Sequence, residues 1–169
     1  ERCVVGFGSS GGPPMMNVLY NNHYQIVQSP GYVMIMAEMV HDARIIRLNG
    51  KHPTENITPW LGDSIGHWEG NTLVVETTNF NPQHTFRGGL RHFFAITSGA
   101  IVTERFTRIS KDQILYRFYV DDPDIYSQVW AGEMPLKAID EKIYEYACHE
   151  GNYSMANILA GAREEEKRR

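Results

Sequence analysis

Hydrophobic and polar residues alternate along most of the chain between residues 23 and 148, and turn-forming residues interrupt this pattern at short intervals. A period of two is typical of β-strands, whose successive side chains point to opposite faces. The pattern predicts strands at roughly ten-residue spacing, joined mostly by short turns. The expected strands are 23–29, 32–40, 43–48, 65–69, 72–78, 101–109, 114–120, 126–136 and 142–148.

The two ends of the chain follow other patterns. Glycines and prolines between Gly6 and Pro14 predict an irregular N-terminal segment over residues 1–22. Residues 79–99 are expected to form a long crossing loop or a lid. Residues 152–166 predict a C-terminal α-helix, because Met155, Ile158, Leu159 and Ala162 recur at helical spacing and would pack on the barrel.

Together these elements predict a mainly β protein. Its expected architecture is an antiparallel up-and-down, calycin-like β-barrel of about eight strands with a C-terminal α-helix. Neither an internal repeat nor a linker is evident in the sequence, so residues 1–169 are expected to form a single domain. Asn49-Gly50 is a strong turn signal after the 43–48 strand, and residues 51–58 are expected to form a loop.

Composition narrows the range of functions. The 169 residues are 42% hydrophobic and 21% charged, which is ordinary for a globular protein. The net charge of −4 gives no reason to expect a nucleic-acid partner. No apolar run approaches the roughly 20 residues that span a bilayer, so no membrane span is expected.

The sequence contains two cysteines, Cys3 and Cys148, near its two ends. A disulfide between them would close almost the whole chain into one loop and stabilise an exported protein by about 4–5 kcal/mol. The alternative is two unrelated thiols. A cleaved signal peptide is one explanation for a chain that starts at Glu1, and export to the periplasm or the cell exterior is expected. The sequence has no cysteine–histidine cluster, so no metal site is expected.

Two glutamates are the best candidates for carboxylates inside the barrel. Glu104 shares a strand face with Val102 and Phe106, and Glu38 shares one with Met36. A buried carboxylate must be paired or have a raised pKa, and a raised pKa suits a general acid or base. The alternative is a structural ion pair with an arginine such as Arg44 or Arg105, or a position on the outer wall.

Three histidines have acidic neighbours in the sequence. His41 follows the 32–40 strand, His67 shares a strand face with Glu69, and His149 precedes Glu150. The alternative for each is a hydrogen-bonded structural histidine. The resulting hypothesis is an acid–base site that needs no cofactor, with these candidate catalytic residues: His67, Glu69, Glu38, His41, Glu104 and His149.

Aromatic residues and methionines exceed what a small core needs. A barrel of eight strands can hold one small ligand, and aromatic and methionine side chains are suitable lining. The alternative is that most of them form ordinary core. The predicted ligand-binding residues are Trp60, Trp68, Tyr116, Phe118, Trp130 and Met36.

Several motifs resemble those of known proteins. The segments Gly66–Phe80 (GHWEGNTLVVETTNF), Glu104–Arg108 (ERFTR), Val120–Pro123 (VDDP) and Tyr144–Tyr153 (YEYACHEGNY) resemble a group of uncharacterised exported bacterial proteins. This resemblance extends from about Tyr24 to Ala162 and implies no catalytic residues, because no activity is assigned to that group. The glycine, tryptophan, glycine and apolar-strand pattern also resembles calycin-like (lipocalin-type) barrels.

Two functions from different classes follow. The leading hypothesis is a barrel that binds a small hydrophobic or aromatic molecule and acts on it by acid–base chemistry, as an isomerase or lyase. The rival is a non-catalytic exported carrier or a structural subunit of a larger assembly. A third option is a homo-oligomer formed through an exposed edge strand or residues 79–99. Convergence of His67, Glu38 and Glu104 on a cavity would favour the enzyme.

Overall fold

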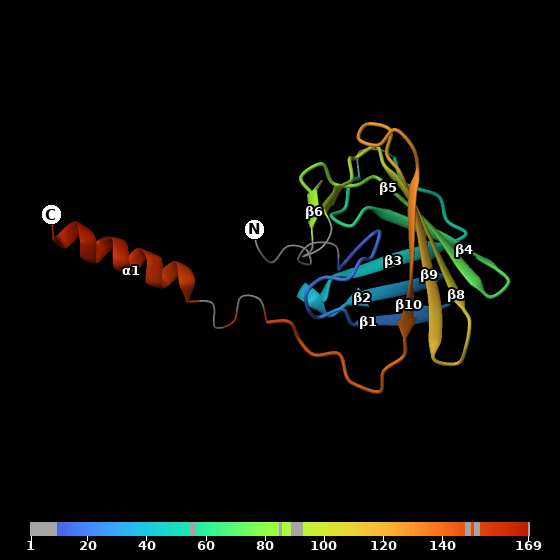
Figure 1. Cartoon of the computed structure of the whole chain (residues 1–169), viewed down its shortest axis with the longest axis horizontal. Helices are drawn as coiled ribbons and strands as arrows, with labels where there is room; N and C mark the ends of the chain where they lie inside the picture. The colour runs from blue at the N-terminus through green and yellow to red at the C-terminus, as the bar shows by residue number, and fades with distance from the viewer. Residues whose placement is uncertain are drawn as a thin grey trace.

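The computed structural model describes residues 10–54, 57–84, 86–88, 93–147, 150 and 153–168. Eight strands form one sheet in the order β1-β2-β3-β4-β5-β8-β9-β10, and this sheet curls into a half-barrel (Figure 1). The strands of the sheet are β1 (Tyr24–Ser29), β2 (Tyr32–Ala37), β3 (Ala43–Leu48), β4 (Asp63–Glu69), β5 (Thr72–Thr78), β8 (Ile101–Arg108), β9 (Gln113–Asp121) and β10 (Trp130–Lys137). A separate hairpin comprises β6 (Phe86–Gly88) and β7 (Phe93–Ala95), and the helices are η1 (Met39–His41) and α1 (Ser154–Lys167).

The predicted fold class is confirmed: the protein is mainly β, with a curled sheet and one C-terminal helix. One strand pair departs from the antiparallel scheme. β3 and β4 run parallel, with Ile46 opposite Ser64 and Leu48 opposite Gly66. Parallel neighbours need a crossover between them, and residues 49–62 form it. Asn49, at a φ of 54°, lies in a turn, as Asn49-Gly50 predicts, and this turn begins the crossover loop.

Three strand predictions need correction. The strand expected over 32–40 ends at Ala37, because the short 3-10 helix η1 follows and Glu38 occupies its N-cap. The strand expected over 126–136 begins only at Trp130. Residues 142–147 form no strand, although their side chains alternate, because they pair with no neighbouring backbone; Cys148 lies outside the described residues.

The core fills the inside of the curled sheet. Alternate residues of β8 and β9 point inward, so that Val102, Phe106, Tyr116 and Phe118 are each at most 5% exposed. These side chains pack against Val33, Ile35, Ile46 and Val75 from β2, β3 and β5. The segment that precedes β1 and the β6–β7 hairpin lie at one end of the sheet (Figure 1), and they add Met15 and Phe94 to the same cluster.

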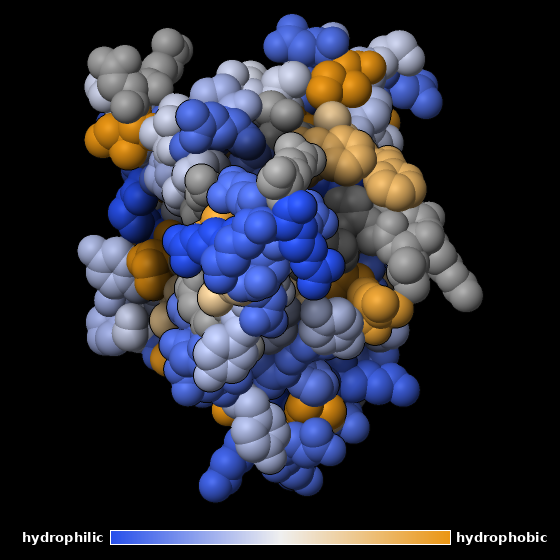
Figure 2. Space-filling view, turned by 90° about the vertical axis from the view of Figure 1, so that its left-hand side faces the viewer, coloured by the Kyte–Doolittle hydropathy of each residue, from blue (hydrophilic) through white to orange (hydrophobic). Residues whose placement is uncertain are grey.

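The C-terminal helix forms where the periodicity predicts it, but its predicted packing on the barrel is wrong. No residue of α1 is buried, and Met155, Ile158 and Leu159 are all exposed. α1 lies well apart from the sheet (Figure 1), and its hydrophilic C-terminal end faces the viewer in Figure 2. The helical spacing of these apolar residues predicts a helix, but it carries no information about which surface they contact. Among the described residues, no helix is both long and apolar enough to cross a membrane.

Candidate functional site: the groove at the open seam

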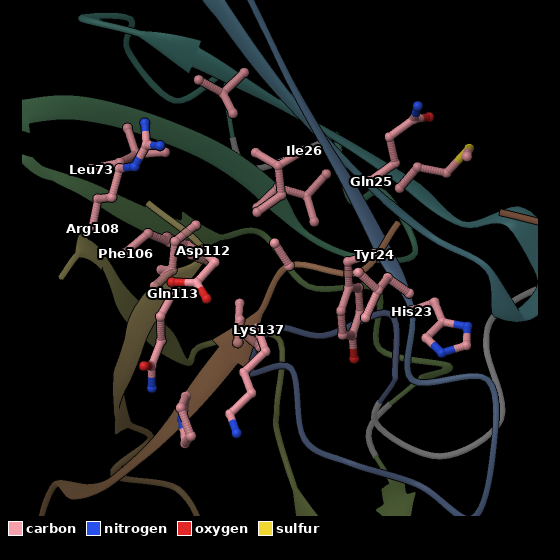
Figure 3. A pocket seen from close by; sticks show the side chains of 18 of the residues that line it. His23, Tyr24, Gln25, Ile26, Leu73, Phe106, Arg108, Asp112, Gln113 and Lys137 are labelled. Atoms are coloured by element: carbon pink, nitrogen blue, oxygen red, sulfur yellow. The ribbon is translucent and has the colours of Figure 1, made fainter. Parts of the chain in front are cut away.

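The half-barrel leaves a groove between its two edge strands, β1 and β10. Its volume is about 1360 Å³, and residues of both edges line it (Figure 3). The apolar part of its lining comes mainly from the inner face of the sheet: Ile26, Val33, Ile35, Leu73, Phe106, Ile114 and Leu136. The groove is therefore the part of the barrel interior that the eight strands leave uncovered.

Strand register explains why β1 contributes to this lining. Tyr24, Ile26 and Gln28 lie opposite Ala37, Ile35 and Val33 of β2, and opposite residues of an antiparallel pair share a face. Because Ile35 and Val33 point into the core, every second residue of β1 points inward as well. Tyr24 and Ile26 therefore meet the groove. Gln25 of the opposite face also lines it, whereas Val27 does not.

Tyr24 connects the groove to a buried polar cluster. Its side chain lines the groove in Figure 3 and also packs against the core. Burial raises the pKa of Tyr24 to about 12, an effect that nearby Arg44 opposes and nearby Glu104 reinforces. The Tyr24 side chain therefore links the lining of the groove to the Arg44–Glu104 pair, and its phenol is protonated at neutral pH.

Arg44 and Glu104 form the centre of this cluster. Arg44 Nη1 donates to Glu104 Oε2 at 2.6 Å and Nη2 donates to Oε1 at 3.0 Å. Tyr116 donates its hydroxyl proton to Oε1 at 2.6 Å and accepts the Met15 N–H at 2.8 Å. Glu104 is thus a carboxylate inside the barrel, as predicted, and it forms the structural ion pair with Arg44 that was the alternative to a catalytic role.

A second buried arginine, Arg87 of β6, lies near this pair. It is 1% exposed, donates through Nη1 to the Gly12 carbonyl, and lies over the Phe80 ring at 5.7 Å. Burial and the neighbouring charge of Arg44 lower the pKa of Arg87 to about 10. Its Nε and Nη2 have no hydrogen-bond partner among the described residues. Because neither atom is accessible to solvent, there is no room beside them for a bound anion.

Glu38 is buried but lies away from Glu104, at the start of η1. Its carboxylate accepts hydrogen bonds from Asn21 Nδ2 at 2.6 Å and from the Tyr144 N–H at 3.1 Å, and His23 Nδ1 lies 3.4 Å away. Burial alone would raise the pKa of Glu38, but the Tyr144, Asn21 and His23 contacts outweigh it, so the pKa is lowered. A lowered pKa is the opposite of what the acid–base hypothesis expects for this residue.

His67 and Glu69 share a face of β4, as predicted, but it is the outer face. His67 Nε2 lies 3.2 Å from Glu69 Oε1, and Arg105 donates to Glu69 Oε2 at 2.7 Å. Both side chains are about half exposed. Their expected inward direction is wrong because Trp68, opposite Leu73, takes the inward position between them. His41 is also exposed, in η1, and His149, Cys3 and Cys148 lie outside the described residues.

The predicted catalytic residues do not converge. Within the described part of the chain, no hydrogen bond or ion pair joins His67, Glu38 and Glu104 to one another. They lie on the outside of β4, at the start of η1 and inside β8, respectively.

The predicted ligand-binding residues separate into three groups. Trp68 and Met36 line the groove. Tyr116 and Phe118 are buried core residues, and Trp130 packs edge-on against Phe118 at a ring separation of 5.5 Å. Trp60 is 39% exposed and does not line the groove. The sequence reasoning missed Tyr24 as a lining residue, although its alternation with Ile26 and Gln28 could have indicated it.

A polar cluster on the crossover loop was also missed. His52 Nδ1 lies 2.6 Å from Asp63 Oδ2, and its Nε2 lies 3.2 Å from Glu76 Oε1. Arg47 donates to both oxygens of Asp63 at 2.8 Å. Because carboxylates occupy both ring nitrogens of His52, the cluster tethers the loop to β4 and β5. No sequence spacing relates His52 to Glu76, so only the fold identifies this contact.

No group of three or more histidine, cysteine, aspartate or glutamate side chains is arranged to hold a metal ion within the described ranges. Comparison of the chain with protein-family models, with curated proteins and with solved structures finds no match. The groove is therefore the feature of the described structure that bears most directly on function.

Proposed function

We propose that this protein binds an elongated hydrophobic molecule in the groove between β1 and β10. The observation that carries the proposal is the groove itself, a space of about 1360 Å³ whose lining includes apolar side chains of the inner face of the sheet. Small-molecule sites are typically concave, mainly apolar and fitted with a few polar groups. Tyr24 is such a group, and Trp68 at the groove could stack on a ligand.

Charge around the groove favours a ligand that carries an acidic group. Four cationic side chains line it, namely Arg108, Lys111, Lys137 and Lys142, against the two acids Asp112 and Glu141. This local excess of two positive charges occurs on a chain whose net charge is −4. An amphiphile such as a fatty acid combines an apolar chain with a head group that these cations attract.

The hydrogen bonds of the two buried carboxylates, Glu104 and Glu38, favour ligand binding without catalysis. Glu104 already accepts two hydrogen bonds from Arg44 and one from Tyr116, so its oxygens are occupied. Glu38 is likewise occupied by Asn21 and the Tyr144 N–H. Acid–base catalysis stays a prediction of the sequence, whereas a carrier requires only the groove.

Two neighbouring residues of β1 test the proposal, because their side chains are similarly exposed but point to opposite faces of the sheet. Ile26 is 38% exposed and lines the groove, whereas Val27 is 41% exposed and does not line it. Ile26→Glu should weaken binding of a dansyl-labelled fatty acid by about tenfold or more, because the ligand would bury a charge. Val27→Glu is the matched control and should bind as the wild type does.

Fluorescence titration measures the affinity, and thermal unfolding confirms that both variants fold. Native mass spectrometry of protein purified from its source would then identify a co-purified molecule by its mass. Absence of saturable binding by the wild type, or equal losses in the two variants, would contradict the proposal.

A further inference from the structure

The outer edge of β1 has an unusual composition for an edge strand that is left unpaired. Tyr24–Ser29 has the sequence YQIVQS and contains neither a charge nor a proline. Natural sheets usually protect a free edge with lysine, proline or a covering segment. β10, at the other edge, follows that rule, because it contains Glu133, Pro135 and Lys137. The contrast suggests that another segment pairs with β1.

Residues 138–144, named the strap from here on, run beside this edge. The strap leaves the end of β10, where the Ala138 N–H donates to the Asp112 carbonyl at 2.7 Å. It passes below β1 in Figure 1 and reaches the start of that strand, where the Tyr144 N–H donates to Glu38 at 3.1 Å. The strap therefore runs antiparallel to β1, and its seven residues are long enough to match the six of β1.

The two isoleucines of the strap define a register. Ile139 and Ile143 line the groove together with Ala138, Glu141 and Lys142, whereas Asp140 and Tyr144 do not. In an extended strand, Ile139 and Ile143 share one face with Glu141, and this apolar face is the inward one. Opposite residues of a strand pair must share a face, so the strap's inward residues must lie opposite the inward residues of β1.

One register meets this condition and also keeps Tyr144 near Glu38. It places Ile143 opposite Tyr24, Glu141 opposite Ile26 and Ile139 opposite Gln28. Tyr144 then lies opposite His23, whose carbonyl already accepts the Glu38 N–H at 2.9 Å. In the same register Asp140 lies opposite Val27 on the outer face.

We propose that the strap pairs with β1 as an additional antiparallel strand when a ligand occupies the groove, and so closes the half-barrel over it. This inference rests on the proposed ligand-binding function. In the structure the strap is held at its two ends but makes no ladder with β1. Closure over an empty groove would enclose a void, whose lining lacks packing partners on one side, whereas closure over a ligand fills that space and satisfies the free backbone groups of β1.

A pair of engineered cysteines tests the register. Val27→Cys with Asp140→Cys places two thiols opposite each other on the outer face, away from the groove. Ser29→Cys with Asp140→Cys is the control, displaced by two residues, and neither of these side chains lines the groove. With the dansyl-labelled fatty acid bound, the cross-linked fraction of the first pair should rise about tenfold, which a difference of ~1.4 kcal/mol between the two states produces. The control pair should change little.

Peptide mass mapping identifies the new bridge and separates it from any bridge of Cys3 or Cys148. Hydrogen exchange of the wild type should show slower exchange in β1 and the strap when the fatty acid is bound. If the probe binds but neither cross-linking nor exchange changes, or if both cysteine pairs respond equally, the strap proposal is wrong. If the probe does not bind, the proposed function fails, and ligand-driven closure fails with it.

Discussion

Arg44 and Glu104 form a two-pronged ion pair that is almost completely removed from solvent, with side-chain exposures of 2% and 0%. Two N–H···O bonds join strands β3 and β8, which are not neighbours in the sheet. The pair therefore connects opposite walls of the half-barrel through its interior. Each charge depends on the other, because an unpaired charge in a core is strongly destabilising.

Glu104→Gln should lower the free energy of unfolding by about 3–5 kcal/mol, since it leaves the Arg44 charge buried without a counter-charge. Urea unfolding followed by tryptophan fluorescence measures the change. Glu69→Gln is a suitable control, because the Glu69–Arg105 pair lies on the exposed outer face and its loss should scarcely move the midpoint. Similar midpoints for the two variants would show that the buried pair does not hold the walls together.

Tyr116→Phe should cost about 1–3 kcal/mol of unfolding free energy, because it removes a donor to Glu104 and the acceptor of the Met15 N–H. The loss of the second contact should also loosen the segment that precedes β1. Hydrogen exchange at Met15 measures this second effect. Tyr32→Phe, at a tyrosine that is 48% exposed, is the matched control and should leave both the midpoint and the exchange rate unchanged.

Stability should depend on Asp63 at acidic pH. Burial alone would raise the pKa of Asp63, but hydrogen bonds from Arg47 and His52 outweigh burial, so the pKa is lowered. A carboxyl group whose pKa is lower in the folded state stabilises the fold above its unfolded pKa of about 3.9, and this contribution disappears as the pH falls through the folded pKa. Asp63→Asn should therefore be less stable than the wild type at pH 7.

The difference between the Asp63→Asn and wild-type urea midpoints should shrink as the pH falls from about 4 through the lower folded pKa, because the unfolded wild-type chain takes up the Asp63 proton before the folded state does. Asp140→Asn, at an exposed carboxylate, serves as the control across the same pH series. A constant difference between Asp63→Asn and the wild type at all pH values would mean that the charge of Asp63 does not contribute.

The sequence predicts the strands better than it predicts their partners. Alternation alone places Val102, Glu104 and Phe106 on the inner face of β8, and it does so because strand geometry is local. Alternation also places His67 and Glu69 on one face, but the choice between inside and outside depends on the pairing of Trp68 with Leu73. A pattern within one strand carries no information about that pairing.

Contacts between residues far apart in the sequence explain the other differences between the predicted and the observed fold. The parallel pairing of β3 with β4 depends on where a loop of fourteen residues, 49–62, returns the chain, and Asn49-Gly50 indicates only a turn. The groove arises because residues 142–147 do not complete the sheet, although their alternation is that of a strand. A segment with alternating side chains becomes a strand only where the free backbone edge of another strand is available and pairing with it is favourable.

Gly132 of β10 is required by the close approach of Phe118. A Cβ atom at Gly132 would lie 2.6 Å from the Phe118 ring, which is buried and cannot move aside freely. Gly132→Ala should therefore destabilise the fold by about 1–3 kcal/mol through overpacking. Gly161→Ala is the control, because nothing lies within 4 Å of the corresponding position on α1. That change should only raise the helicity of α1, seen by circular dichroism.

Lys137, at the end of β10, should select acidic ligands. It lines the groove near Asp112, so Lys137→Glu replaces an attractive charge with a repulsive one beside the proposed head group. The variant should bind the dansyl-labelled fatty acid several-fold more weakly and the corresponding dansyl-labelled alcohol as well as the wild type does. Raising the ionic strength to about 1 M shortens the range of charge interactions to about 3 Å and should reduce the difference. Lys51→Glu, outside the groove, provides the control for a general change of net charge; equal losses in the two variants would exclude a local role for Lys137.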